Sequence, residues 1–428
     1  MPDERVSWTE RGLALRIRAE RLLLRRGAPL TLGLVALRRA SVARRQRLIA
    51  VTGSQGKTTT VRAVRCALGL PESDFAEASR NMMASTAWGI LCQSPWARHA
   101  VVELGASGPG SLGRKMRQFV PHVAVITSFG TEHHRAFASV DALREEKASV
   151  ARLLSPSGRL VLNADDAVVA AMAGETRAPV ATFGTAPGAG LRATSVRLDW
   201  PNGTVVEGVS RRGEPFLVRS RLFGIGGVQA VLAALAVADL EGVPLALASN
   251  RLETLRPTLR RLQPYTLANG AVAIVDEAKA PPEGMAVFLD FARQLGAPIR
   301  RTFVLGALDP DPVGDEGYYR RTASEVAALA EAVVVVGAPE VQGAYANAFA
   351  EAGMDAGRLT YASDVVAARA ALPRDLGPGA AVFIKATGKP RLGRIAIAAS
   401  GRPVGCRRLS CAYEQVYCER CPLLAKRP

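Results

Sequence analysis

Residues 48–61 constrain the fold of this chain more than any other segment. Their sequence, LIAVTGSQGKTTTV, is a short apolar run, a glycine-rich turn and the beginning of a helix. Gly53 and Gly56 allow a backbone to approach a phosphate group closely, and the amides that follow lie at a helix N-terminus, where anions bind. The segment therefore predicts a phosphate-binding loop between a buried strand and a helix.

The polar side chains of this loop indicate how a nucleotide would be held. Lys57 supplies a positive charge for the terminal phosphates, and Thr58 offers a hydroxyl oxygen to Mg²⁺. The common pattern has glycine where this chain has Val51, so the loop is a shorter version of it. An ordinary glycine turn before a helix is the alternative interpretation. We expect nucleotide contacts from Gly53, Ser54, Gln55, Gly56, Lys57, Thr58 and Thr59.

The composition indicates a globular protein with room for two or three domains. Of the 428 residues, 48% are hydrophobic and 22% are charged, a usual balance for a chain that folds around apolar cores. The net charge of +17 favours anionic partners, such as nucleotides, phosphorylated precursors or an anionic membrane surface. No nucleic-acid recognition motif accompanies the charge, so nucleic acid is not expected. A composition rich in Arg and Ala also produces this balance without any polyanion.

Residues 1–46 predict a basic amphipathic segment, in which Arg alternates with Leu, Ala and Ile. Such a helix would lie on an anionic membrane surface or, alternatively, pack on the body of the protein with its Arg face in water. The longest apolar run, residues 28–37, is too short to span a bilayer, and no signal peptide is evident. We expect a cytoplasmic protein, with peripheral contact at the inner face of the membrane if this segment meets it.

Residues 47–256 are expected to form a first domain, in which residues 48–170 alternate apolar runs with helical patterns. The runs at 100–104, 123–127 and 159–163 are short, as in strands buried on both faces, and a helix is expected over 140–154. Strands separated by helices predict an α/β fold with a doubly wound parallel sheet that contains the phosphate loop.

Two further stretches complete the predicted organisation. Residues 180–222 alternate apolar and polar residues around a turn at 201–203, which predicts a small antiparallel section, and an Ala/Leu-rich helix follows at 228–240. A second α/β unit is expected over 257–400, before a tail at 401–428. Its strand candidates are residues 272–276, 302–306, 332–337 and 381–385.

Five motifs in order resemble signatures of the Mur ligase superfamily, the ATP-dependent amide-bond ligases of peptidoglycan synthesis and their relatives. They are TGSQGKTTT at 52–60, VVELGA at 101–106 with Pro-Gly at 109–110, PHVAVIT at 121–127 leading to TEHH at 131–134, SVDALREEK at 139–147 and LNADD at 162–166. The resemblance spans about residues 46–400 and is dense to residue 166. It is strongest to the branch that adds D-alanyl-D-alanine to the muramoyl tripeptide.

The resemblance implies a central ATP-binding domain, a C-terminal Rossmann-like ligase domain and a specific reaction. The γ-phosphoryl group of ATP is transferred to an acceptor carboxylate, and an amino acid or ammonia then attacks the acyl phosphate, with release of ADP. Phosphoryl transfer needs positioning and charge neutralisation more than covalent help. The chain is thus expected to be a carboxylate–amine ligase of cell-wall, peptide or polyglutamate synthesis that uses ATP and Mg²⁺.

The resemblance also implies residue roles. Glu103 and Thr58 would bind Mg²⁺, and His133 would serve a second metal ion. Lys147 stands where much of the family has a carbamylated lysine, so Lys57, His133 and Lys147 are the catalytic candidates. The alternatives are an ordinary salt bridge for Glu103 and exposed surface positions for His133 and Lys147.

The C-terminal unit matches the family less well. Asp276 and Lys385 occupy positions that contact the nucleotide in the family, but Lys279 replaces the usual His or Asn. In the first unit, the family generally carries His-Asn and a later Asn where this chain has Gly226, Gly227 and Ala230. These differences put recognition of the nucleotide base in question.

The N-terminal region also departs from the peptidoglycan ligases. About 45 residues precede the loop, too few for the family's separate UDP-binding domain, so a UDP-muramoyl substrate held in the usual way is not expected. Shorter relatives include the ligase subunit that amidates the lipid-linked precursor. A glutaminase or another protein partner is therefore a further expectation.

Six cysteines occur, and four of them cluster in the tail. Cys66 and Cys92 stand in apolar segments and are predicted to be core residues. In a reducing compartment four clustered thiolates suit a structural tetrahedral Zn²⁺, although an iron–sulfur cluster or no metal at all are alternatives. The predicted ligands are Cys406, Cys411, Cys418 and Cys421.

Two other classes of function compete with the ligase. A catalytically degenerate nucleotide-binding scaffold or partner subunit is suggested by Gly226, Gly227 and Ala230. A nucleic-acid-binding module is suggested by the net charge and the cysteine cluster. Retention of Lys57 and Glu103 favours the enzyme, because a scaffold needs no phosphoryl-transfer residues.

Overall fold

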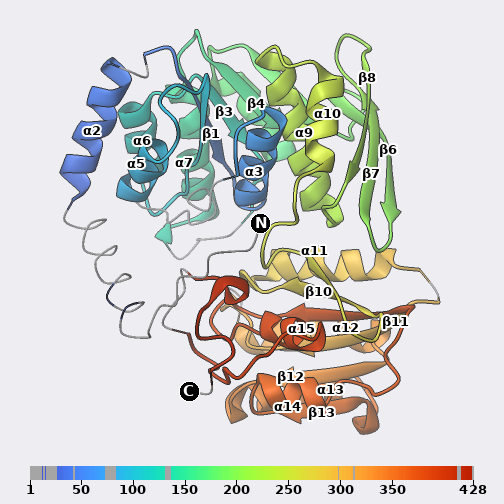
Figure 1. Cartoon of the computed structure of the whole chain (residues 1–428). Helices are drawn as coiled ribbons and strands as arrows, with labels where there is room; N and C mark the ends of the chain where they lie inside the picture. The colour runs from blue at the N-terminus through green and yellow to red at the C-terminus, as the bar shows by residue number, and fades with distance from the viewer. Residues whose placement is uncertain are drawn as a thin grey trace. The chain divides into compact units, whose positions relative to one another are not determined.

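The computed structural model describes residues 12, 15, 27–41, 44–72, 83–130, 136–296, 298–311, 314–411 and 416–426. The chain divides into two compact units, one ending at Arg256 and the other beginning at Pro257. Each unit is built around a sheet of its own (Figure 1). The predicted fold class, α/β with two parallel-sheet cores, is confirmed.

The sheet of the first unit has eight strands in the order β2-β1-β3-β4-β5-β6-β7-β8. Neighbours from β2 to β6 pair in parallel, whereas β7 pairs antiparallel with both β6 and β8. The antiparallel section expected within residues 180–222 therefore continues the parallel sheet, which it joins through β5. The strands are β1 (Arg47–Thr52), β2 (His99–Glu103), β3 (Val123–Ile126), β4 (Arg159–Asn163), β5 (Val180–Gly184), β6 (Leu191–Asp199), β7 (Gly203–Val209) and β8 (Pro215–Ser220).

Helices cover both faces of this sheet because its buried strands are apolar on both sides. Ile49 and Val51 of β1 pack in one core with α3, α9 and α10, whereas Leu48 and Ala50 pack in another with α2, α5, α6 and α7. The helices are α2 (Ala28–Ala40), α3 (Lys57–Ala67), α5 (Met83–Leu91), α6 (Ser111–Phe119), α7 (Val140–Leu153), α8 (Ala167–Ala171), the 3₁₀ helix η2 (Met172–Glu175), α9 (Gly224–Leu240) and α10 (Leu245–Glu253).

Helix α2 lies in the basic segment predicted at the N-terminus, and it packs against α5. The guanidinium of Arg38 donates hydrogen bonds to the carbonyls of Ile90 (2.7 Å) and Leu91 (2.9 Å), where a cation is favoured by the helix dipole. Packing on the protein body therefore holds for α2, while nearly all of residues 11–26 lie outside the described part of the chain. Within the described residues, no helix is long and apolar enough to cross a membrane.

The second unit contains a six-stranded sheet in the order β13-β12-β11-β14-β10-β9, parallel except for β9. The strands are β9 (Gln263–Thr266), β10 (Val272–Asp276), β11 (Arg300–Leu305), β12 (Ala332–Val336), β13 (Leu359–Ala362) and β14 (Ala380–Lys385). The helices are α11 (Pro282–Gln294), α12 (Asp315–Leu329), α13 (Pro339–Glu351), α14 (Val365–Ala370) and α15 (Gly393–Ala399), with 3₁₀ helices η3 (Ala356–Arg358) and η4 (Cys418–Arg420). Phe303 and Phe383 stack across adjacent strands with ring centroids 5.1 Å apart, which packs one face of the sheet.

A buried carboxylate joins the beginnings of β1 and β2 to the end of α9. Glu241 is 4% exposed and accepts hydrogen bonds from Arg47 Nε (2.7 Å) and His99 Nε2 (2.8 Å). Burial alone would raise the pKa of Glu241, but the hydrogen bonds from His99 and Arg47 outweigh burial and lower the pKa to about 2. Because this pKa lies below the ordinary value of 4.5, ionised Glu241 stabilises the fold above pH 4.5 and loses that effect as the pH falls toward 2.

We expect Glu241→Gln to lower the free energy of unfolding at pH 7 by about 3 kcal/mol, because Arg47 loses its counterion and the buried His99 loses its charged acceptor. Urea unfolding from pH 7 to pH 3 measures the difference between wild type and variant, which should shrink as the pH falls below 4.5. Glu214→Gln, at an exposed position in the turn before β8, is the matched control and should change stability little. An undiminished difference at acid pH would contradict the assigned role of the charge.

Candidate nucleotide and metal site

The predicted phosphate loop joins β1 to α3 at the point where the sheet connections change direction. Strand β1 lies between β2 and β3, so the chain leaves the carboxyl ends of β1 and β3 toward opposite sides, the usual place for a ligand in such sheets. Gly56, with φ of 77°, precedes the first residue of α3, Lys57. Thr58 and Thr59 are buried in the first helical turn. The loop amides therefore lie at a helix N-terminus beside a switch point.

The loop rests directly on the segment that follows β3. A Cβ atom at Gly53, whose φ is 145°, would stand 2.1 Å from Thr127 Oγ1, so only glycine fits. Thr127 Oγ1 donates to Gln55 O (2.6 Å), and Ser54 N donates to Ser128 O (2.9 Å). These contacts fix the loop from behind. Sequence reasoning did not assign Thr127 or Ser128 to the site, although both lie in a quoted motif or next to it.

Residues of the LNADD motif in turn hold the segment after β3. Asn163 Nδ2 donates to Thr127 O (2.9 Å), and Asp166 Oδ2 accepts from Phe129 N (2.6 Å). Asp166 also caps α8 by accepting from Val168 N. The motif therefore acts on the loop through the segment at 127–130, and its side chains serve as positioning residues.

Two side-chain oxygen atoms that could bind a metal ion lie close together beside the loop. Thr58 Oγ1 donates to Glu103 Oε2 at 2.8 Å, which brings together the two predicted Mg²⁺ ligands from α3 and the end of β2. Lys57 Nζ lies over the loop and donates to Gly53 O (2.8 Å) and Ser54 O (2.7 Å). Hard oxygen ligands suit Mg²⁺, so the residues present fit the ion that the resemblance implies.

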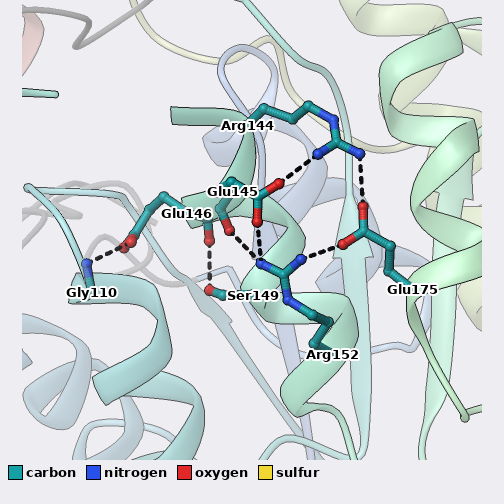
Figure 2. A network of polar contacts seen from close by, with 7 residues as sticks. All are labelled: Gly110, Arg144, Glu145, Glu146, Ser149, Arg152 and Glu175. Atoms are coloured by element: carbon teal, nitrogen blue, oxygen red, sulfur yellow. Dashed lines mark hydrogen bonds and ion pairs between the residues drawn. The ribbon is translucent and has the colours of Figure 1, made fainter. Parts of the chain in front are cut away.

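Helix α7 is fixed from both sides around the predicted lysine. Glu146 accepts from Gly110 N (2.6 Å) and from Leu112 N (2.6 Å), at the beginning of α6. On the other side, Arg144 and Arg152 form ion pairs with Glu145 and Glu175 (Figure 2). Lys147, next to Glu146, is 3% exposed. The alternative of a solvated surface lysine is therefore excluded.

A second buried lysine lies near these carboxylates and was not predicted. Lys115 of α6 is 2% exposed and donates to Gly105 O at 2.6 Å. Burial lowers the pKa of Lys115 to about 8, although the charges of Glu103 and Glu146 oppose the shift. No spacing rule links Lys115 to Glu103, because the two meet only through packing of α6 at the end of β2. His133, the predicted ligand of a second metal ion, lies outside the described residues.

In the second unit, Asp276 and Lys385 form an ion pair at the carboxyl ends of adjacent parallel strands β10 and β14. Lys385 is 1% exposed and lies 5.4 Å from the centre of the Phe288 ring. Asp309, which sequence reasoning missed, accepts from Ala280 N (2.6 Å) and Thr387 Oγ1 (2.7 Å). It thereby ties together the loops that follow β10, β11 and β14.

Of the three α9 residues that replace the family's polar residues, Gly227 and Ala230 are packing positions here, whereas Gly226 is not. A Cβ at Gly227 would stand 2.8 Å from Leu222 Cβ, and Ala230 is fully buried. A Cβ at Gly226 would meet no atom within 4 Å. The start of α9 therefore packs closely against the residues after β8, where the family carries side chains that touch the nucleotide.

The predicted zinc or iron–sulfur site in the tail is not supported by the structure. Within the described residues, which include Cys406, Cys411, Cys418 and Cys421, no three His, Cys, Asp or Glu side chains form a group that could hold a metal ion. The tail is held instead by Arg394, a buried residue of α15. Its guanidinium donates to Cys406 O (2.8 Å), Cys406 Sγ (2.8 Å) and Pro390 O (2.8 Å).

The surroundings of the tail cysteines favour hydrogen bonding over metal ligation, since Cys406 Sγ accepts from Arg394 and burial disfavours the Cys418 thiolate. Burial raises the pKa of Cys418 to about 12, with the charge of Glu277 adding to the effect, whereas metal ligation uses the thiolate. The two other cysteines also differ from expectation in part. Cys66 is half-buried, and Cys92 is exposed rather than in the core.

Comparisons with known proteins identify the family of this chain. The family model "Mur ligase middle domain" matches residues 51–238. The UDP-N-acetylmuramoyl-tripeptide–D-alanyl-D-alanine ligase of Mycobacterium tuberculosis is 30% identical over 372 residues, which cover 82% of this chain and 72% of the relative. The chain belongs to the Mur ligase family. The UDP-N-acetylmuramoylalanine–D-glutamate ligase of Symbiobacterium thermophilum is likewise 30% identical, with 84% and 74% covered.

Solved structures of Mur ligases share the fold. A crystal structure of MurF from Acinetobacter baumannii superposes with a TM-score of 0.70 at 24% identity, covering 87% of this chain and 80% of that one. The MurF ligase of Thermotoga maritima in complex with ADP gives a TM-score of 0.68 at 18% identity, covering 84% and 80%. At these identities the likeness establishes the fold alone.

We expect Gly53→Ala to weaken ATP binding by about 100-fold, because the added Cβ displaces the loop from Thr127 and misplaces its amides. Calorimetric titration with ATP and Mg²⁺ measures the effect. Gly89→Ala on α5 is the control: its Cβ meets no atom within 4 Å, and it should stabilise the protein by about 0.5–1 kcal/mol. Unchanged ATP affinity in Gly53→Ala would show that the loop does not hold the phosphates.

Proposed function

We propose that this protein is an ATP-dependent carboxylate–amine ligase that forms an amide bond through an acyl phosphate and releases ADP. The observation that carries the proposal is the 2.8 Å approach of Thr58 and Glu103 beside the Lys57 loop. This arrangement gathers a cation, helix N-terminal amides and two hard oxygen ligands at one edge of the sheet, which is what phosphoryl transfer requires. Family membership adds independent support.

Each candidate site residue of the first unit has a proposed role. The loop amides and Lys57 bind and orient the phosphates of ATP. Thr58 and Glu103 would hold Mg²⁺, which neutralises charge that develops on the transferred group. Glu146 and Ser111 keep α6 and α7 in register, since Ser111 Oγ donates to Glu146 Oε1 at 2.9 Å. His133 is proposed to serve a second metal ion.

Carbamylation of Lys147 is part of this proposal. The ammonium group would first lose one proton, and the resulting amine nitrogen would bond to the carbon of CO₂ and lose a second proton, which gives a carboxylate-like metal ligand. The 3% exposure of Lys147 and its place beside Glu146 support a role inside the site rather than at the surface.

The acceptor is proposed to be a peptide or a related cell-wall precursor, because the relatives compared above are named as ligases of UDP-N-acetylmuramoyl compounds. The amine is proposed to be an amino acid, or ammonia supplied by a glutaminase partner. Asp276 and Lys385 are proposed to contribute to nucleotide binding from the second unit. We propose a cytoplasmic location, with peripheral membrane contact through the basic N-terminal segment.

The ligase predicts release of ADP and phosphate that depends on one particular pair of acid and amine. The assay crosses amino acids, glutamine and ammonia with peptide, lipid-precursor and polyglutamate acceptors, in the presence of Mg²⁺ and bicarbonate. Lys57→Ala should lower the turnover by on the order of 10²- to 10³-fold, because an electrostatic contact to the transferred group is lost. Folded protein that binds ATP but turns over no pair would favour a nucleotide-binding scaffold, and release of AMP would contradict the acyl phosphate.

Carbamylation predicts that Lys147→Ala lowers the turnover by about 100-fold or more through loss of a metal ligand. Acetate or propionate should restore part of the activity in Lys147→Ala but none in Lys57→Ala, which serves as the control. Protein incubated with carbon-13 bicarbonate should show a carbamate signal by NMR that Lys147→Ala lacks. Equal carbamate signals in both proteins would rule out modification at this residue.

A further inference from the structure

A cavity at the C-terminal end of α3 is lined by four arginines. Its volume is about 490 Å³. The lining residues that determine its chemistry are Arg62, Arg65, Arg251, Arg256, Cys66 and Glu72. We call it the arginine cavity. All six residues belong to the first unit, on α3, on α10 or in the segments directly after them.

The arginine cavity is separate from the phosphate loop. The loop lies at the beginning of α3, whereas Arg65 and Cys66 are in its last turn. Eleven residues of α helix extend about 16 Å, so one nucleotide phosphate chain cannot occupy both ends at once. The cavity is therefore distinct from the phosphate loop.

Three of the four arginines, Arg65, Arg251 and Arg256, have no carboxylate within ion-pair distance among the described residues. Within the described residues, Arg62 is the member of the four that lies near a carboxylate, with Nη2 at 3.4 Å from Glu72 Oε1, and that carboxylate is 56% exposed. Arg65, by contrast, donates to neutral oxygens, namely Gln93 Oε1 (2.5 Å) and Pro71 O (2.7 Å). Among the described residues that line the cavity, four guanidinium groups and one carboxylate leave an excess of three positive charges.

Two of the arginines are held in place, and their hydrogen-bonding capacity is not exhausted. Arg65 is 5% exposed, and its Nε is buried without a hydrogen-bond partner among the described residues. Arg251 Nη1 donates to Ala67 O (3.0 Å). Its guanidinium packs beside Gly69, where an added Cβ would stand 2.8 Å from Arg251 Cζ. A guanidinium carries five N–H donors in a fixed planar arrangement, so one such contact leaves several donors for a ligand.

We propose that the arginine cavity binds a multiply charged oxyanion, such as the phosphate or diphosphate group of a small molecule. Planar guanidinium groups match the paired oxygens of phosphate and carboxylate, and such charge-assisted hydrogen bonds are among the strongest in proteins. Leu70, Pro71 and Leu255 add apolar lining that would contact the uncharged part of the ligand. The site is independent of whether the protein is a ligase.

Inorganic pyrophosphate is the probe, titrated calorimetrically into the full-length protein carrying Lys57→Ala, so that the phosphate loop lacks its positive charge. Arg251→Gln with Arg256→Gln should weaken pyrophosphate binding by about tenfold or more, because two charge-assisted contacts are lost. The control removes the same charge with Arg211→Gln and Arg212→Gln, which are exposed in the turn before β8 and do not line the cavity. This control should leave the affinity within about twofold, as expected for distant surface charges.

Three outcomes would overturn the proposal: no binding to the Lys57→Ala protein, equal loss in the two double variants, or full affinity in Arg251→Gln/Arg256→Gln. Thermal unfolding of each variant verifies that it is folded. If the double variant unfolds, Arg256→Gln alone, at an exposed position, should still weaken binding by about threefold. A parallel titration with citrate at equal ionic strength distinguishes a carboxylate-bearing ligand from a phosphate-bearing one.

Discussion

The site of this protein depends on a contact that leaves no room for a side chain at position 53. Gly53 lies against Thr127 at the end of β3, and the Thr127 hydroxyl then fixes Gln55 in the loop. Asn163 and Asp166, after β4, hold the same segment from the other side. Three neighbouring strands thus set the shape of one loop, and amides held in advance lose little freedom when phosphate binds.

Buried charges lie near Glu103, the carboxylate that contacts Thr58 of the loop, and they serve function better than stability. Lys115, Glu146 and Lys147 are each at most 6% exposed, and Glu103 lies close enough to affect the pKa of Lys115. The attraction between buried charges seldom exceeds the free energy needed to remove them from water. A cluster of buried charged side chains is therefore better explained by binding of a charged ligand than by a contribution to folding stability. The same reasoning applies to the arginine cavity at the far end of α3, where positive charge is in excess.

Local sequence patterns were sufficient to predict much of the fold, but they could not predict contacts between segments that are distant in the sequence. The strand expected at 159–163 is observed as β4 at the same residues, because an apolar run bounded by turns needs no tertiary information. Strands β9 and β13 were not predicted, since each has four residues and lies at a sheet edge with partial exposure. Lys115 and Asp309 reach their partners only through packing. In the tail, cysteine spacing indicated a metal, but it contained no sign of the buried Arg394 that binds Cys406.

The central claim, transfer of phosphate from ATP to a carboxylate before amide formation, is tested most directly with an acceptor whose carboxylate oxygens are labelled with oxygen-18. After turnover with Mg²⁺, ATP and the amine that supports ADP release, mass spectrometry of the released phosphate reports the fate of the label. The account predicts that each phosphate carries one labelled oxygen from the acceptor, because the acyl phosphate breaks at its carbon–oxygen bond. Unlabelled phosphate, or label found in AMP, would contradict it.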